Sequence, residues 1–333
     1  MKREVCRKME KYDVTALGEL LIDFTENGSS TQGNPLLEAN PGGAPCNVLA
    51  MLAKLGHETA FIGKVGRDMF GDQLEAAIRE VGIHADGLKR DVEVHTTLAF
   101  VHTAPDGDRD FSFYRNPGAD MMLGAEDVDT DLIGKSRLFH FGTLSMTHEK
   151  VREATKYALK TAKENRLLIS FDPNVREPLW DNMETCREMV EYGIANCDIL
   201  KISDNEIIWF TGLEDFDAGL DLLLEKYSPK LILLSMGRDG SMACTRKERV
   251  TVPAFIQENT IETTGAGDTF CACVLHYVLA CGLEGLTTEN MKKMLVFANA
   301  AASIVTTRKG ALRVMPDADE IRGFLRAKGI IFQ

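Results

Sequence analysis

Short apolar runs alternate with longer segments of helical period along most of this chain. In NVLAMLAKLG, Val48, Met51 and Leu55 share one helical face, and a glycine ends the helix. Helices are predicted at residues 47–56, 70–82 and 269–282. Strands are predicted at residues 14–24, 59–66, 138–142, 167–172, 198–203 and 230–235. Runs of leucine, isoleucine and valine between helices are typical of parallel strands covered on both faces, so the pattern predicts an α/β layered sheet.

Residues 96–115 interrupt this alternation. They form two stretches of alternating apolar and polar residues around Pro-Asp-Gly, which indicates a β-hairpin. Because a helix is expected at this point, we place the hairpin outside the main sheet, where it could form a small β-rich flap with the loop 25–43. A surface hairpin without a function explains the pattern equally well.

Composition and charge exclude several classes of protein. The 333 residues suffice for one large or two medium domains, and no linker divides them. The net charge of −12 argues against nonspecific nucleic-acid binding, because no surplus of cations could neutralise phosphates. No apolar run approaches the roughly 20 residues of a spanning helix, and no secretory signal is apparent, so we expect no membrane partner. The eight cysteines include no C-x-x-C pair, which predicts reduced thiols in a cytoplasmic protein without a zinc site.

The segment TTGAGD begins at Thr263 and precedes a long apolar helix. Gly265, Ala266 and Gly267 have little or no side chain to shield the backbone, so their N–H groups can point into one cavity. At a helix N-terminus such donors make an anion site suited to a phosphate. Asp268 would stand where that phosphate meets its acceptor, placed to take a proton from an attacking hydroxyl. A plain helix cap, with glycines required only by the turn, is the alternative.

A second glycine turn, NPGGAPCN, runs into the first predicted helix. Gly42 and Gly43 would let a small ligand lie against bare backbone, and Asn47 can both donate and accept a hydrogen bond. Taken by itself, this segment is better explained as a simple loop-to-helix turn. Asp23 ends the first predicted strand, where strands of open α/β sheets border a ligand crevice, and its carboxylate could hold two hydroxyls. The alternative is a solvated loop aspartate.

Together the two glycine segments resemble the signatures of the ribokinase-like (PfkB) family of carbohydrate kinases, in the family's order: GGAPCN and then ETTGAGD. The resemblance extends from about Tyr12 onward, and segments such as FYRNPGADMML, FDPNVREPLW and LKISDNE are most similar to fructokinases. It implies a ribokinase-like three-layer α/β/α sandwich with a mostly parallel central sheet. It also implies a single PfkB domain over residues 1–333, with a small β-sheet lid from about 25–41 and 94–117 inserted in it.

The resemblance implies a role for each matching residue. Asp268 would be the base for the sugar hydroxyl, and the backbone of Gly265, Ala266 and Gly267 would be the anion hole. The implied sugar-binding residues are Asp23, Gly42, Gly43, Asn47, Arg115, Asn174 and Arg176. The implied nucleotide-binding residues are Ser235, Gly237, Gly240 and Asn299, the last beside the adenine. Glu206 would order Mg²⁺ through water.

Two positions depart from the family's pattern. Glu262 replaces the usual aspartate beside a monovalent-cation site, so Glu262 and Thr264 could ligate K⁺, or the longer side chain could replace the need for it. The N-x-x-E motif here runs from Ser203 to Glu206, which keeps the acid and changes its partner. Neither change removes the base or the donors, so we expect an active enzyme and leave its K⁺ dependence open.

The resemblance therefore implies a cytoplasmic kinase that uses ATP and Mg²⁺, most directly to convert fructose to fructose 6-phosphate. Fructose or a related small sugar is the expected partner, and relatives suggest a homodimer formed through the lid. A 2-keto-3-deoxygluconate kinase is one alternative, because such kinases carry arginines near the positions of Arg115 and Arg176. A catalytically silent sensor of sugar or nucleotide is another. An oxidoreductase is disfavoured, because the first strand leads to GELLIDF and not to G-x-G-x-x-G.

Overall fold

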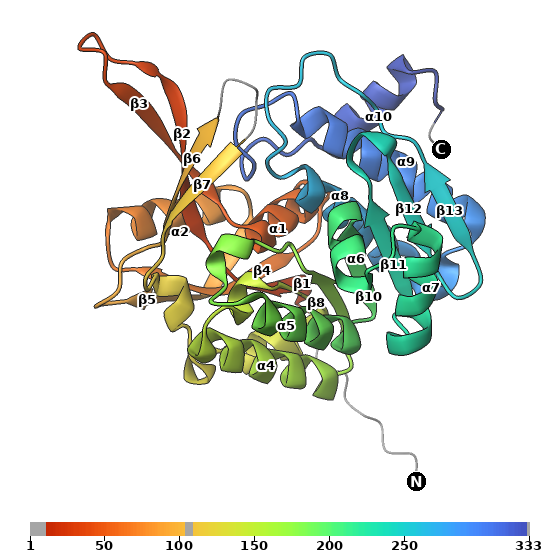
Figure 1. Ribbon diagram of the computed structural model, residues 1–333, viewed down its shortest axis with the longest axis horizontal. Coiled ribbons are helices and arrows are strands. Elements are labelled where there is room, and N and C mark those ends of the chain that lie inside the picture. The colour runs from red at the N-terminus through yellow and green to blue at the C-terminus, as the bar shows by residue number, and fades with distance from the viewer. Residues whose placement is uncertain (1–10, 104–108, 332–333) are drawn as a thin grey trace.

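The computed structural model describes residues 11–103 and 109–331, which form two β-sheets of unequal size (Figure 1). The larger sheet has nine strands in the order β13-β12-β11-β10-β9-β8-β1-β4-β5. They are β1 (Tyr12–Leu17), β4 (Thr59–Gly66), β5 (Ile83–Asp91), β8 (Ser136–Gly142), β9 (Leu168–Asp172), β10 (Ile199–Ser203), β11 (Leu231–Ser235), β12 (Ser241–Cys244) and β13 (Arg249–Val252). Neighbours from β11 to β5 run parallel, and β12 and β13 pair antiparallel at one edge.

Alternate side chains of the strands enter two separate cores. In β11, Leu231 and Leu233 face one core, whereas Ile232 and Leu234 face the other. The first core contains α1 (Ala44–Lys54), α2 (Met69–Glu80), α8 (Ala266–Cys281), α9 (Thr288–Val305) and α10 (Ala318–Ala327). The second contains α3 (Thr130–Gly134), α4 (Glu149–Glu164), α5 (Met183–Asn196), α6 (Asp204–Thr211) and α7 (Phe216–Tyr227). The predicted three-layer sandwich with a mostly parallel sheet is confirmed.

The smaller sheet has four strands in the order β3-β2-β6-β7. They are β2 (Leu21–Ser29), β3 (Pro35–Gly42), β6 (Leu98–Thr103) and β7 (Arg109–Tyr114), and β2 and β3 project away from the sandwich (Figure 1). The hairpin expected at 96–115 is present as β6 and β7 and lies outside the main sheet, as predicted. The Pro-Asp-Gly turn predicted between them lies outside the described residues.

Two predictions in this region are wrong. The single strand at 14–24 is two strands in different sheets, because the chain leaves the main sheet between β1 and β2. Buried apolar residues stand on both sides of Gly18 and Glu19, so the two halves resemble one strand. Residues 25–43 form the expected small β-rich flap with residues 96–115, but largely as the strands β2 and β3 and not as a loop. The outer parts of these two strands are exposed on both faces and so show no apolar alternation.

The predicted helices at 47–56, 70–82 and 269–282 correspond to α1, α2 and α8, and each begins one to three residues earlier than predicted. Within the described part of the chain, none of the helices combines the length and the hydropathy that crossing a bilayer requires.

Candidate active site

Helix α8 begins at a turn that requires glycine. Gly265 is its N-cap with φ 76°, in the left-handed region, and a β-carbon there would lie 2.7 Å from the β-carbon of Ala311. The chain thus enters the helix with N–H groups that have no carbonyl four residues back to accept them. One donor is already used, because the N–H of Ala266 bonds to the carbonyl of Thr263 at 3.2 Å. The donors best placed for an anion therefore start at Gly267.

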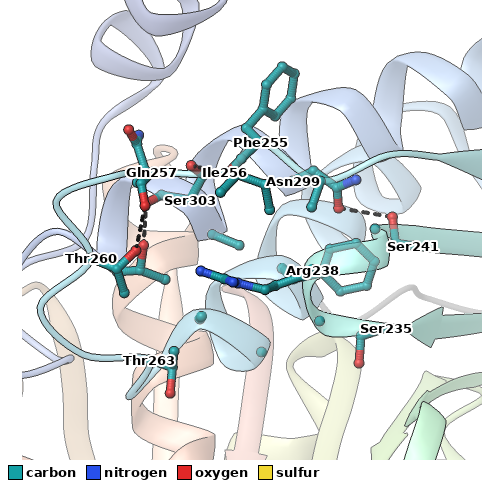
Figure 2. Close-up of a pocket in the computed structure, with 18 residues that line it drawn as sticks. Ser235, Arg238, Ser241, Phe255, Ile256, Gln257, Thr260, Thr263, Asn299 and Ser303 are labelled. Atoms are coloured by element: carbon teal, nitrogen blue, oxygen red, sulfur yellow. Dashed lines mark hydrogen bonds between the residues drawn. The ribbon is translucent and has the colours of Figure 1, made fainter. Parts of the chain in front are cut away.

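Two cavities meet at this helix tip. The first, of about 370 Å³, lies against α8, α9 and β12 (Figure 2). The second, of about 330 Å³, lies between α1, α8 and the smaller sheet. Thr263 and Gly267 line both cavities. A molecule in one cavity can therefore meet a molecule in the other across the tip of α8.

Asp268 lies in the second cavity and is 9% exposed. The side-chain amide of Asn47 in α1 donates to its Oδ2 at 2.8 Å, so the two glycine segments of the sequence meet here. Oδ1 of Asn47 is buried without a hydrogen-bond partner in the described chain, which leaves an acceptor for a bound molecule. Burial raises the pKa of Asp268, while the Asn47 bond and the charges of Lys201 and Arg176 oppose the rise. The carboxylate is thus a stronger base than an aspartate in water.

Most of the predicted sugar-binding residues line the same cavity. They are Asp23, Gly43, Asn47, Asn174 and Arg176. Gly42 does not line it, but a β-carbon there would lie 2.4 Å from Oδ2 of Asp23, so this glycine makes room for the carboxylate. Burial raises the pKa of Asp23 to about 7, an effect that the charge of Arg176 opposes.

Arg115 is placed differently. It is buried and does not line the second cavity. Its guanidinium pairs with Asp120 at 2.6 Å and donates to Oγ1 of Thr147 at 2.8 Å and to the carbonyl of Leu144 at 3.0 Å. Leu144 lines the cavity, so Arg115 holds part of its wall in place. A direct role for Arg115 in binding sugar or phosphate stays a prediction.

The predicted nucleotide-binding residues line the first cavity. They are Ser235, Gly237, Gly240 and Asn299. The amide of Asn299 accepts from Ser241 at 2.9 Å and donates to the carbonyls of Val252 and Pro253. It therefore shapes the wall of the cavity, as Figure 2 shows for its bond to Ser241. Arg238, which the sequence did not single out, extends across the cavity toward Thr260 (Figure 2).

The family model of pfkB family carbohydrate kinases matches residues 11–318. The chain belongs to the pfkB family of carbohydrate kinases. It is thus a phosphotransferase, and the resemblance drawn from the two glycine segments is confirmed.

Similar proteins match the pfkB chain over nearly its full length. Probable fructokinase-5 of Arabidopsis thaliana is 38% identical over 323 residues, 95% of this chain and 98% of that protein. The structure of Xylella fastidiosa fructokinase with bound ATP matches with a TM-score of 0.86 at 29% identity, over 95% of this chain and 99% of that chain. A double mutant of Vibrio cholerae fructokinase, bound to fructose, ADP and potassium ion, matches with a TM-score of 0.84 at 26% identity, over 96% and 100% of the two chains. These matches confirm the ribokinase-like fold.

In this pfkB kinase, Glu206 lines neither cavity and joins two segments beside them. Its carboxylate accepts hydrogen bonds from the N–H and the hydroxyl of Ser203 at 2.9 and 2.8 Å, and from the N–H of Val175 at 2.8 Å. Burial would raise the pKa of Glu206, but the charge of Lys201 and these bonds outweigh it and lower the pKa. Glu206 thereby fixes the loop after β9 that carries Asn174 into the second cavity.

The predicted K⁺ residues lie beside the tip of α8. Thr264 lines the second cavity. One carboxylate oxygen of Glu262 accepts the N–H of Gly310 at 2.6 Å, and the N–H of Glu262 bonds to the carbonyl of Thr306. Glu262 therefore ties the segment before α8 to the segment after α9.

The sequence reasoning missed a buried ion pair beside the second cavity. Nζ of Lys201 lies 3.0 Å from Oδ2 of Asp172, and the two side chains are 8% and 6% exposed. Lys201 also lines the cavity that contains Asp268. The available signal was a lysine inside the apolar run DILKIS, since lysine is rarely buried without a partner.

Glu19, from the segment GELLIDF, was also missed. It is 4% exposed, lines the second cavity and accepts the N–H of Ala44 at 2.8 Å. This bond attaches the start of α1, and with it Asn47, to the end of β1. Burial raises the pKa of Glu19 to about 7.

Proposed function

We propose that this pfkB kinase is an ATP-dependent fructokinase that forms fructose 6-phosphate. The observation that carries the proposal is the meeting of the two cavities at Gly267, with Asp268 on one side of the junction. The first cavity is assigned to ATP and the second to the sugar. The γ-phosphoryl group then lies at the tip of α8, and the sugar hydroxyl lies beside the carboxylate.

In the proposed reaction the 6-hydroxyl oxygen of fructose forms a bond to the γ-phosphorus of ATP. The bond from that phosphorus to the β,γ-bridging oxygen breaks and releases ADP, and Asp268 accepts the hydroxyl proton. Phosphoryl transfer depends mainly on positioning and charge stabilisation, which the N–H groups at the start of α8 are suited to provide. Asp268 must be ionised to act, so its raised pKa predicts that turnover falls with decreasing pH earlier than for an ordinary aspartate.

The lining of the second cavity supports a neutral ketose. Asp23 and Asn47 offer acceptors for hydroxyl groups, and Arg176 contributes a cation to the lining. A 2-keto-3-deoxygluconate kinase would use arginines near both Arg115 and Arg176 for the carboxylate, but Arg115 is bonded to Asp120 outside the cavity. A silent sensor is disfavoured because the base and the glycines of the turn are all present.

The residues fit a magnesium ion that arrives with the nucleotide. No group of three or more acidic, histidine or cysteine side chains in the described ranges is arranged to hold a metal by itself. Mg²⁺ usually keeps several waters and is held by one or two carboxylates with substrate phosphates. Glu206 uses three of the roughly four acceptor positions of its carboxylate, which leaves one for a water on the ion. When bound, Mg²⁺ would neutralise phosphate charge.

Three further expectations accompany the proposal. The smaller sheet would act as a lid over the sugar, with the boundaries about 25–41 and 94–117 given by the resemblance. The homodimer through this lid and the cytoplasmic location stay predictions. The K⁺ site at Glu262 and Thr264 also stays a prediction, which the assay below addresses.

An ADP-coupled assay with a panel of sugars tests the proposal. We expect fructose to give the highest kcat/KM, with 2-keto-3-deoxygluconate and ribose at least tenfold lower. Running each sugar with K⁺ and with an organic cation in its place determines the K⁺ dependence. A higher kcat/KM for 2-keto-3-deoxygluconate than for fructose would reject the fructokinase assignment, and sugar binding by calorimetry without turnover would support the silent sensor.

A further inference from the structure

We propose that Lys201 is a catalytic residue, whose ammonium group stabilises the migrating phosphoryl group from the wall of the second cavity, and that Asp172 is its positioning residue. The inference rests on the phosphoryl path proposed above. It gives strands β9 and β10, which lie outside the two glycine segments, a part in the chemistry.

The position of the ammonium group is the first support. A β-carbon built on Gly267 would lie 3.5 Å from Nζ of Lys201, so the charge lies directly beside the glycine that both cavities share. Lys201 also lines the sugar cavity together with Asp268. It therefore adjoins the place where the acceptor oxygen and the phosphorus must meet.

The register of the main sheet fixes this position. Strands β9 and β10 run parallel with Leu200 opposite Phe171, so Lys201 and Asp172 are next to each other at the carboxyl ends of the two strands. The carboxylate contacts the ammonium through both oxygens, at 3.0 and 3.2 Å. A lysine held at two points has little freedom to move when the phosphate charge shifts, which is what preorganised stabilisation requires.

The balance of charge is the second support. Burial would lower the pKa of Lys201, but Asp172 and Glu206 outweigh it and raise the pKa, so the side chain is a cation. Burial raises the pKa of Asp172, and the charge of Lys201 opposes this rise. The ammonium group is thus held as a cation beside Gly267, where a phosphoryl group bearing negative charge would pass.

A purely structural ion pair is the competing explanation, and a double variant separates the two. Lys201→Met alone leaves Asp172 buried without a partner, which destabilises a protein whatever the role of the lysine. Lys201→Met combined with Asp172→Leu replaces the ion pair by apolar side chains of similar volume, and such replacements are often neutral for stability. We expect this double variant to have a Tm close to that of the wild type and a kcat at least 100-fold lower, as for other lost charge-stabilising donors. KM for fructose and ATP should change less than about threefold, because the loss is confined to the transition state.

Asp172→Asn alone is the second variant and keeps the ammonium group. We expect its kcat to fall less than tenfold, because the charge that acts on the phosphoryl group remains. Where the double variant does not fold, this variant keeps the inference open to refutation through a large loss of kcat. A double variant with kcat within threefold of the wild type would overturn the inference, as would an Asp172→Asn protein that folds but loses 100-fold in kcat. Absence of turnover in the wild type with every sugar would instead reject the proposed function.

Discussion

Gly267→Ala separates the requirements of the fold from those of the reaction. The backbone at Gly267 is not in the left-handed region. A β-carbon there would meet only Nζ and Cε of Lys201, at 3.5 and 3.9 Å, which are ordinary contacts. The substitution should therefore be accepted by the fold. Alanine is favoured over glycine by about 1 kcal/mol within a helix, and by less in its first turn, so we expect Tm to stay the same or to rise slightly.

The same methyl group should lower kcat strongly. Gly267 lines both cavities, so its β-carbon would occupy the junction through which the phosphoryl group passes. Displacing a phosphate from one preorganised N–H donor costs roughly 100- to 1,000-fold in kcat, or about 3 to 4 kcal/mol. We expect a decrease of at least 100-fold in kcat in the ADP-coupled assay, measured with saturating fructose and ATP.

Gly323→Ala is the matched control. Gly323 lies in α10, where a β-carbon would meet only the end of Arg326 at 3.9 Å, and it lines neither cavity. We expect this variant to gain slightly in stability, with kcat unchanged. A Gly267→Ala protein that keeps kcat within threefold of the wild type would refute the passage of the phosphoryl group past the tip of α8. A loss of Tm in that variant would refute the reasoning about its fold.

Three further predictions address the helix turn, the nucleotide and the buried acids. Gly265→Ala should lower the free energy of unfolding by about 1–2 kcal/mol or more, because φ is 76° and the new β-carbon meets that of Ala311 at 2.7 Å. Urea unfolding measures this loss, and an unchanged midpoint contradicts the prediction. Arg238 lines the cavity assigned to the nucleotide. Arg238→Ala should therefore raise KM for ATP about tenfold, because one charge-assisted hydrogen bond is lost, with little change in kcat. An unchanged KM argues against the contact. Three buried carboxyl groups have their pKa raised to about 7, those of Glu19, Asp23 and Asp172. They bind protons in the folded state that the unfolded chain has lost above about pH 4, so they favour folding less as the pH rises. His140 and His276, whose pKa burial lowers to about 3 and about 4, act in the opposite direction. With three carboxyl groups against two imidazoles, the Tm of the ligand-free protein should fall from pH 5 to pH 7.5, and a rising Tm in calorimetry contradicts this.

The fold followed from the sequence wherever burial was uniform. Apolar runs predicted five strands of the main sheet closely, namely β4, β8, β9, β10 and β11. The break after Leu17 was missed because apolar residues stand on both sides of Gly18 and Glu19 and do not show which of two sheets each half joins. Residues 25–43 were expected in the β-rich flap but not as strands, since neither outer face of β2 and β3 is buried.

The parts of the site that could be predicted are those where the backbone conformation requires glycine. Gly265 and Gly43 have positive φ values at the starts of α8 and α1, so their segments could be recognised without a structure. The contact between Asn47 and Asp268 joins residues 221 positions apart, and it depends on how α1 packs against α8.

Charged residues were the least predictable, because their partners decide their role. Arg115 is matched by Asp120, five residues later, and is held outside the sugar cavity. Lys201 pairs with Asp172 only because β9 and β10 are neighbours in a particular register. The partner of Lys201, 29 residues away, cannot be identified from local sequence.

The kcat of Asp268→Asn tests the central claim most directly. The amide has nearly the shape of the carboxylate and cannot accept the proton of the sugar hydroxyl, and a lost general base costs about 100- to 10,000-fold in rate. With fructose and ATP saturating, we expect a kcat at least 100-fold below that of the wild type, while calorimetry shows ATP and fructose bound with Kd values within about threefold. A kcat close to that of the wild type would contradict the assignment of Asp268 as the base.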